Sequence, residues 1–227
     1  MRPGNWLVQS LRDRGPVLTL KVAVSALADL SFDWKHGTDT MKWVEVDSFE
    51  TASQNKPRAV CYQATKVRPL AKLLGKLQLP TTGSFVDLGC GKGRVLLIAS
   101  QLGFRRVIGV EFCTRLCRQA RENVHRFRAR HPNCSLIDVI ESDVALYEFA
   151  GDESVLFIYN PFDEVVMKQM MDNIRNSVRR MPRDIWLIYN TPIQHETIQR
   201  EGDFARCEHY EIGGTTFHVY SQFNPRS

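Results

Sequence analysis

Hydrophobic positions along the chain form two kinds of segment, and their alternation predicts the fold. Short apolar runs predict strands over residues 85–88, 107–111, 136–140, 154–159 and 185–189. Segments with helical spacing predict helices over residues 94–99, 113–128, 167–181 and 194–201. Two alternating runs on either side of Gly213-Gly214 then predict an antiparallel hairpin. The order predicts a doubly wound, mostly parallel seven-strand α/β sheet with a C-terminal antiparallel hairpin.

Residues 1–55 differ from this pattern and predict a helical N-terminal extension or lid, ahead of a domain over residues 56–227. After a short amphipathic helix near Trp6, a helix is expected over residues 18–30 with Leu27 and Leu30 facing inward. The polar and aromatic segment 32–40 then either covers a ligand site or packs on the fold. A further helix is predicted over residues 66–77, with Thr65 as its N-cap.

Composition narrows the class of protein. A chain of 227 residues that is 43% hydrophobic fits one α/β domain with a sizeable core. A charged fraction of 24% weighs against wholesale disorder. The formal net charge of +5 is a mild excess, which favours an ordinary basic surface over a dedicated nucleic-acid binder.

Cysteine spacing and hydropathy predict the compartment. The 6 cysteines show no metal-ligand or redox spacing, so we expect reduced thiols, no metal site and a cytoplasmic protein. The most apolar N-terminal run, residues 17–30, contains Lys21 and Asp29 and is too short to cross a bilayer. We therefore expect no membrane span. The oligomeric state is not indicated by the sequence.

One stretch carries the clearest chemical signal: Phe85-Val86-Asp87-Leu88-Gly89-Cys90-Gly91-Lys92-Gly93-Arg94. A strand end, a turn with three alternate glycines and the start of a helix are typical of a nucleotide-cofactor site. Glycine lets the backbone approach a ligand closely, and the helix start offers free N–H groups. The spacing differs from the Gly-x-Gly-x-x-Gly of dinucleotide binders, which weighs against an NAD-dependent oxidoreductase.

Acidic residues are expected at the same edge of the sheet as the glycines. Asp87 precedes the first glycine, Glu111 ends the second strand and Asp143 follows the third. The segment Asn160-Pro161-Phe162 follows the fourth strand. Because parallel strands bring their carboxyl ends to one edge, we expect these residues to converge. Carboxylates suit a cationic, hydroxyl-rich ligand and would repel a pyrophosphate.

With these residues the chain resembles the class I, seven-strand S-adenosylmethionine-dependent methyltransferases. The resemblance implies that the glycine loop cradles the methionine end of the cofactor, that Glu111 binds both ribose hydroxyls and that Asp143 accepts a hydrogen bond from the adenine amino group. It implies the cofactor-binding residues Tyr62, Thr65, Asp87, Gly89, Cys90, Gly91, Gly93, Glu111, Asp143, Val144 and Asn160.

Residues 60–160 are also similar to the non-SET protein-lysine methyltransferases. Tyr62-Gln63-Ala64-Thr65 resembles a segment that closes over the cofactor in some of these enzymes. Asn160, Pro161 and Phe162 are the expected catalytic residues. The Asn160 side-chain carbonyl and the loop carbonyls can accept substrate N–H bonds, and Phe162 can wall or stack on the acceptor. The loop departs from the Asn-Pro-Pro-Tyr/Phe motif of enzymes that methylate adenine, cytosine or glutamine.

We therefore expect an S-adenosylmethionine-dependent N-methyltransferase acting on an amine, either a protein lysine or a small molecule. A nucleic-acid acceptor is less expected. A lysine acceptor must first lose a proton, and a channel lined by Tyr62, Tyr159 and Phe162 would favour this. No general base is evident. The alternative is a catalytically inert cofactor-binding or scaffold protein.

Overall fold

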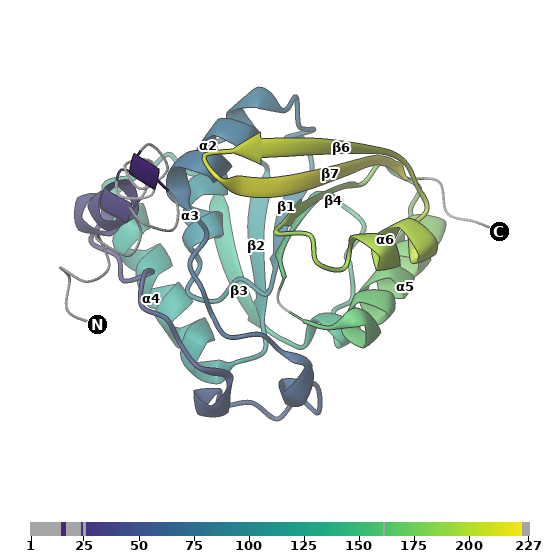
Figure 1. The fold of residues 1–227 in the computed structure, drawn as a ribbon, viewed down its shortest axis with the longest axis horizontal. Coiled ribbons are helices and arrows are strands. Elements are labelled where there is room, and N and C mark those ends of the chain that lie inside the picture. The colour runs from purple at the N-terminus through teal and green to yellow at the C-terminus, as the bar shows by residue number, and fades with distance from the viewer. Residues whose placement is uncertain (1–14, 17–23, 25, 161, 224–227) are drawn as a thin grey trace.

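The structure is a computed structural model that describes residues 15–16, 24, 26–160 and 162–223. The helix expected near Trp6, the first part of the helix expected over residues 18–30, and Pro161 lie outside the described residues. A single 7-stranded sheet with the order β3-β2-β1-β4-β5-β7-β6 forms the centre of the fold (Figure 1). The first five strands run parallel, and β7 pairs antiparallel with both β5 and β6.

The bounds of the elements follow the chain order. The strands are β1 (Ser84–Leu88), β2 (Arg106–Glu111), β3 (Leu136–Glu141), β4 (Glu153–Tyr159), β5 (Trp186–Asn190), β6 (Phe204–Ile212) and β7 (Thr215–Phe223). The α-helices are α2 (Val67–Lys76), α3 (Arg94–Ala99), α4 (Thr114–Arg130), α5 (Glu164–Arg180) and α6 (His195–Glu201). Three short 3-10 helices are η1 (Val46–Ser48), η2 (Lys56–Arg58) and η3 (Val144–Leu146). The predicted doubly wound fold with its terminal hairpin is confirmed.

Two apolar cores sandwich the sheet, because successive side chains of a strand point to opposite faces. Val86 and Leu88 of β1 belong to the core beneath α5, together with Met170. Phe85 of β1 belongs to the opposite core, with Leu70 of α2 and other side chains of α2, α3 and α4. In Figure 1, α3 and α4 lie on one side of the sheet and α5 and α6 on the other. Full burial on both faces explains why the central strands lack polar alternation.

The N-terminal segment departs from the prediction in detail. The helix continues over residues 26–36, so the expected polar segment 32–40 begins inside it. Leu27 and Leu30 are exposed, whereas Ala28 and Phe32 are buried, so the expected inward face was wrong. The helix turns Asp29 inward because this carboxylate pairs with Arg94. An ion pair with a distant residue, which local hydropathy does not report, thus sets the orientation of the helix.

The start of α2 is also built by a distant residue. Its N-cap is Lys66, and no side chain of the cap residue bonds to the helix, so the prediction of Thr65 as N-cap was wrong. The backbone N–H of Val67 instead donates to Asp29 Oδ1 at 2.8 Å. A side chain from the N-terminal helix thereby satisfies a free N–H group of α2. Over the described residues, no helix is long and apolar enough to cross a membrane.

Candidate functional site

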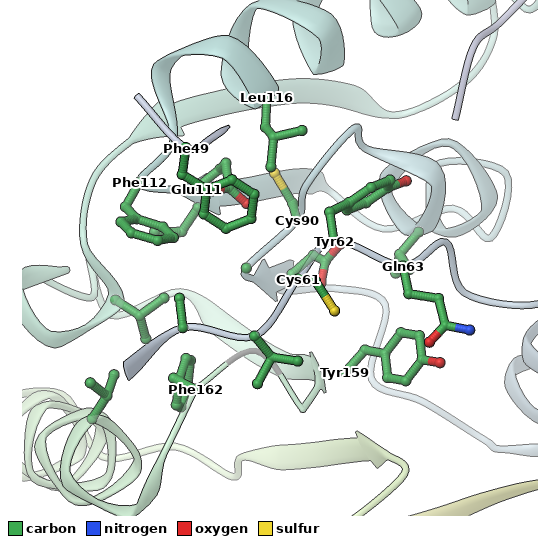
Figure 2. Close-up of a pocket in the computed structure, with 18 of the residues that line it drawn as sticks. Phe49, Cys61, Tyr62, Gln63, Cys90, Glu111, Phe112, Leu116, Tyr159 and Phe162 are labelled. Atoms are coloured by element: carbon green, nitrogen blue, oxygen red, sulfur yellow. The ribbon is translucent and has the colours of Figure 1, made fainter. Parts of the chain in front are cut away.

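A pocket lies at the carboxyl edge of the parallel strands (Figure 2). The glycine loop after β1, the ends of β2 and β4, and the N-terminal segment from Phe49 to Thr65 form its walls. Of the predicted site residues, those that line it are Tyr62, Thr65, Asp87, Gly89, Cys90, Glu111, Asp143, Val144 and Phe162. The structure therefore brings together residues from four strand ends and from the segment ahead of α2.

The glycine loop needs glycine for its backbone and for its neighbours. Gly89, Gly91 and Gly93 have φ values of 90°, 52° and 84°, which lie in the left-handed region. Gly93 is the N-cap of α3. A Cβ at Gly91 would overlap the ring of Tyr62, which packs directly on the loop. Gly91 and Gly93 are not among the residues that line the pocket, so they act by shaping the loop.

Glu111 is buried beside the loop and partly satisfied by it. Its Oε2 accepts the backbone N–H of Gly91 at 2.8 Å, and its Oε1 accepts that of Cys113 at 2.9 Å. Burial raises the pKa of Glu111 to about 7, although these hydrogen bonds oppose the rise. Each carboxylate oxygen keeps a lone pair that can accept from a ligand hydroxyl. These two acceptors are what a pair of ribose hydroxyls, which donate, requires.

Asp87 adds a second buried acid to the same pocket. Burial and the neighbouring Glu111 both raise the pKa of Asp87 well above its usual range. Two buried carboxyl groups without an internal cation are unfavourable when both are charged, and a cationic ligand relieves this cost. The pair therefore suits a ligand that carries positive charge and hydroxyl groups.

Asp143 lies where the third strand ends, and its oxygens already have partners. Its Oδ1 accepts the N–H of Ala145 at 2.8 Å, which caps η3. Its Oδ2 accepts Asn55 Nδ2 at 2.9 Å and the hydroxyl of Ser53. The carboxylate thus joins the N-terminal segment to the sheet edge. One lone pair of Oδ1 remains for a base amino group, the role that the resemblance implies.

Aromatic residues that sequence reasoning missed shape the end of the pocket around Glu111. Phe112 follows Glu111 directly, and Phe49 from the N-terminal segment meets it edge-to-face with 5.8 Å between ring centroids. Leu116 of α4 completes this apolar wall (Figure 2). Phe112 could have been suspected from its place after the strand-end acid. Phe49 carries no sequence signal, because only the folded chain brings it to the sheet.

The part of the pocket away from Phe112 is lined by the uncharged side chains of Cys61, Gln63 and Tyr159, and Phe162 lines it from the lower left of the view (Figure 2). Phe162 is buried in the apolar core under α5 and pairs through its backbone with Ala59. Asn160 is not among the lining residues. Its side-chain oxygen accepts the hydroxyl of Tyr189 at 3.2 Å, and its backbone has a φ of 38°. The catalytic role expected for Asn160 and Phe162 stays a prediction, and Pro161 lies outside the described residues.

Arg94 connects the glycine loop to the N-terminal segment. It is 2% exposed and lies within 3.3 Å of Asp29 and 3.4 Å of Asp33. Its Nε donates to the hydroxyl of Thr40 at 2.6 Å, and its Nη1 donates to the carbonyl of Thr65 at 3.2 Å. The first helical residue after the glycine loop therefore contacts both the N-terminal helix, at Asp29 and Asp33, and the backbone just ahead of α2, at Thr65.

This strand order, with a glycine loop after β1 and an acid at the end of β2, defines a class I methyltransferase fold. Solved structures share it. An RNA methyltransferase from Salinibacter ruber, in complex with S-adenosyl-L-homocysteine, has a TM-score of 0.52 and 17% identity over 72% of this chain and 95% of that one. The glycopeptide N-methyltransferase MtfA, complexed with S-adenosyl-L-methionine, has a TM-score of 0.53 and 13% identity over 69% and 93% of the two chains. At these identities the likeness concerns the fold.

The family follows from the sequence match. The family model of the histone methylation protein DOT1 matches residues 46–176, more than half of the chain, and the chain belongs to this family. Among curated proteins, the trans-aconitate 2-methyltransferase of Variovorax paradoxus (strain S110) is 27% identical over 55% of this chain and 52% of its own length. The trans-aconitate 2-methyltransferase of Enterobacter sp. (strain 638) is 32% identical over 43% of this chain and 34% of its own length. The chain thus spans about half or less of the curated relatives it matches.

Proposed function

We propose that the protein is an S-adenosylmethionine-dependent methyltransferase that transfers a methyl group to an amine. One observation carries the proposal: Asp87 and Glu111 are buried beside a left-handed glycine loop, in a pocket whose other end is neutral and aromatic. The cofactor combines ribose hydroxyls, an ammonium group and a sulfonium, which this arrangement suits. The fold and the family of this chain support the same cofactor.

Residues of the pocket match the separate chemical groups of that cofactor. Glu111 would accept the ribose hydroxyls with the lone pairs left by Gly91 and Cys113. Phe112 would provide an apolar surface for the base. When bound, the cofactor supplies an activated methyl group on a sulfonium, so the protein's main task is to position the acceptor and exclude water.

The neutral end of the pocket supports an amine acceptor. Among the described lining residues, Arg94 is the only lysine or arginine, and it is engaged with Asp29 and Asp33. A polycarboxylate such as the substrate in the names of the curated relatives would meet no available cation there. Tyr159 and Phe162 would instead surround an alkylammonium group and favour its neutral form by desolvation. An amine that has lost its proton presents the lone pair that methyl transfer needs.

The family match favours a protein lysine among the amines, while a small amine is the other acceptor that this end of the pocket can take. Transfer of tritium from labelled S-adenosylmethionine into cell lysate distinguishes them. Label in protein that resists acid hydrolysis as methyl-lysine supports the first, and label in the small-molecule fraction supports the second. Label in neither, from a protein that binds the cofactor, would instead indicate the inert binding protein.

Calorimetric titration with S-adenosylmethionine, S-adenosylhomocysteine and NADH tests the cofactor. We expect the two sulfur ligands to bind and NADH not to bind. A Glu111→Gln variant should weaken binding by about tenfold or more, since it removes charge-assisted hydrogen bonds worth about 1.5–3 kcal/mol each. The matched control is Glu141→Gln, because Glu141 is the register neighbour of Glu111 on β3 and is exposed. Equal affinity in the two variants would reject the site.

A further inference from the structure

Three histidines converge far along the chain from the glycine loop, on the β6–β7 hairpin and the start of α6. His209 of β6 and His218 of β7 are direct partners in the antiparallel register. His195, the first residue of α6, adds its ring from the side, with its centroid 4.3 Å from that of His218. Figure 1 shows α6 beside the hairpin. Two elements that are separate in sequence therefore meet through imidazole rings.

A cysteine lies on the same face of the hairpin. Cys207 precedes His209 by two residues, and alternate residues of a strand share a face. Cys207 pairs across the ladder with Tyr220, just as His209 pairs with His218. The Cys207 Sγ lies 3.7 Å from His209 Nε2. Three imidazoles and one thiol are thus gathered at one position of the fold.

The separations match those of ligands around a tetrahedral metal ion. One ligand nitrogen from each of the three histidines lies within 4.8 Å of the others, and His195 Nδ1 is 3.0 Å from His218 Nδ1. Zinc bonds of about 2.0–2.1 Å to nitrogen and about 2.3 Å to sulfur put tetrahedral ligands about 3.3 Å apart for two nitrogens and about 3.6 Å for nitrogen and sulfur. The Cys207 Sγ–His209 Nε2 distance of 3.7 Å is already near its value, whereas imidazole nitrogens up to 4.8 Å apart would have to move closer on metal binding.

A hydrogen-bond network alone explains only part of the cluster. His195 Nδ1 is 2.6 Å from the hydroxyl of Tyr220 and 3.0 Å from His218 Nδ1. Hydrogen bonds among His195, His218 and Tyr220 can therefore satisfy these three polar groups without a metal. His209 is exposed, and the thiol of Cys207 next to its Nε2 is a weak hydrogen-bond partner. A bound metal ion would give the Cys207 thiol and the His209 imidazole a strong bonding partner.

We propose that His195, His209, His218 and Cys207 bind one divalent metal ion of the zinc type in a closed, four-coordinate structural site. Binding displaces the thiol proton of Cys207 to solvent, because the thiolate is the ligand form. The Tyr220 hydroxyl, 2.6 Å from His195 Nδ1, would give up that hydrogen bond when this nitrogen binds the metal. The metal would tie α6 to the hairpin. This proposal does not depend on the proposed methyl transfer.

The test uses the full chain without a histidine tag, stripped with a chelator and titrated with Zn²⁺ against a chromophoric competitor. We expect one ion bound per chain and a rise in melting temperature with added Zn²⁺. Titration with Co²⁺ should give the intense visible bands of tetrahedral coordination and a near-ultraviolet sulfur-to-cobalt charge-transfer band. Absence of stoichiometric binding of either ion overturns the proposal.

Variants locate the ion. His209→Ala and His209→Gln alter an exposed ring and should weaken Zn²⁺ binding at least tenfold. His125→Ala is the matched control, since His125 is an exposed histidine of α4 outside the cluster, and it should leave binding unchanged. Cys207→Ser should abolish the charge-transfer band. Undiminished binding in both His209 variants overturns the site, and a retained band in Cys207→Ser overturns the thiolate ligand.

Discussion

At the residue scale, Gly91 and Glu111 show how little freedom the loop has. Gly91 has a left-handed backbone, carries the ring of Tyr62 above its Cα and donates its N–H to Glu111. Glu111 in turn is held by the loop and by the first residues after β2. A substitution at either position therefore acts on both the loop and the ligand-binding carboxylate. A control variant separates the effect of such a substitution on cofactor binding from its effect on the stability of the fold.

Gly91→Ala should lose cofactor affinity, whereas Gly103→Ala should not. Both glycines have positive φ, 52° and 80°, so both variants pay the left-handed cost of about 1–2 kcal/mol. Only the Cβ at Gly91 meets the Tyr62 ring, while nothing lies within 4 Å at Gly103. We expect at least tenfold weaker S-adenosylmethionine binding by calorimetry for Gly91→Ala alone. Equal affinities would show that the Tyr62–Gly91 contact does not shape the site.

Cofactor binding should strengthen as the pH rises through about 7. The pKa of Glu111 is about 7, and only its ionised form accepts two hydroxyl hydrogen bonds while keeping its backbone donors. Protonation therefore competes with binding below this pH. Because the ionised fraction changes about tenfold between pH 6 and pH 8, the dissociation constant should fall by about that factor. Calorimetry at both values checks this, and Glu111→Gln should remove the dependence.

At the element scale, the N-terminal segment is joined to the domain by buried charge rather than by a large apolar face. Asp29 caps α2 and pairs with Arg94, and Asp33 accepts hydrogen bonds from Thr38 and Thr40. Ser53 and Asn55 then reach Asp143 at the sheet edge. These contacts hold in place a segment whose residues Phe49 and Asn55 line the pocket. The division at residue 55, and a gating role for the extension, stay predictions.

Arg94→Met should reduce the free energy of unfolding by about 3–5 kcal/mol, because it leaves two mostly buried carboxylates without their cation. The matched control is Arg106→Met. Arg106 pairs with Asp138 at 2.6 Å, but the two side chains are 41% and 36% exposed, so the expected loss is about 1 kcal/mol or less. Urea denaturation measures both. Similar losses would mean that the buried network does not anchor the N-terminal segment.

At the scale of the whole molecule, the pocket draws on strand ends and on the N-terminal segment together. Cofactor binding should therefore stabilise the entire chain against unfolding. At a S-adenosylhomocysteine concentration about 100 times its dissociation constant, the gain is about 2.7 kcal/mol. For a chain of this size that corresponds to a rise in melting temperature of about 5–11 °C. Differential scanning fluorimetry checks this, with NADH as the ligand expected to give no shift.

Much of the fold was determined by the sequence alone, since its signals are local. Buried strands, a glycine turn and helical spacing each depend on residues close together in the chain. The parallel sheet then brings Asp87, Glu111 and Asp143 to one edge, so their meeting was predictable without coordinates. The helix α5 begins earlier than its apolar pattern, at Glu164, because the side chain of Asp163 caps it.

The tertiary structure alone decided which distant side chains meet. Nothing near Asp29 in the sequence shows that it caps α2, and nothing near Phe49 shows that it faces Phe112. The cysteine spacing predicted no metal site, yet histidines from three separate elements meet, with Cys207 beside one of them. Periodicity reports which face of an element is apolar. It does not report the partner of a buried charge or an imidazole, because that partner is fixed only when the elements pack.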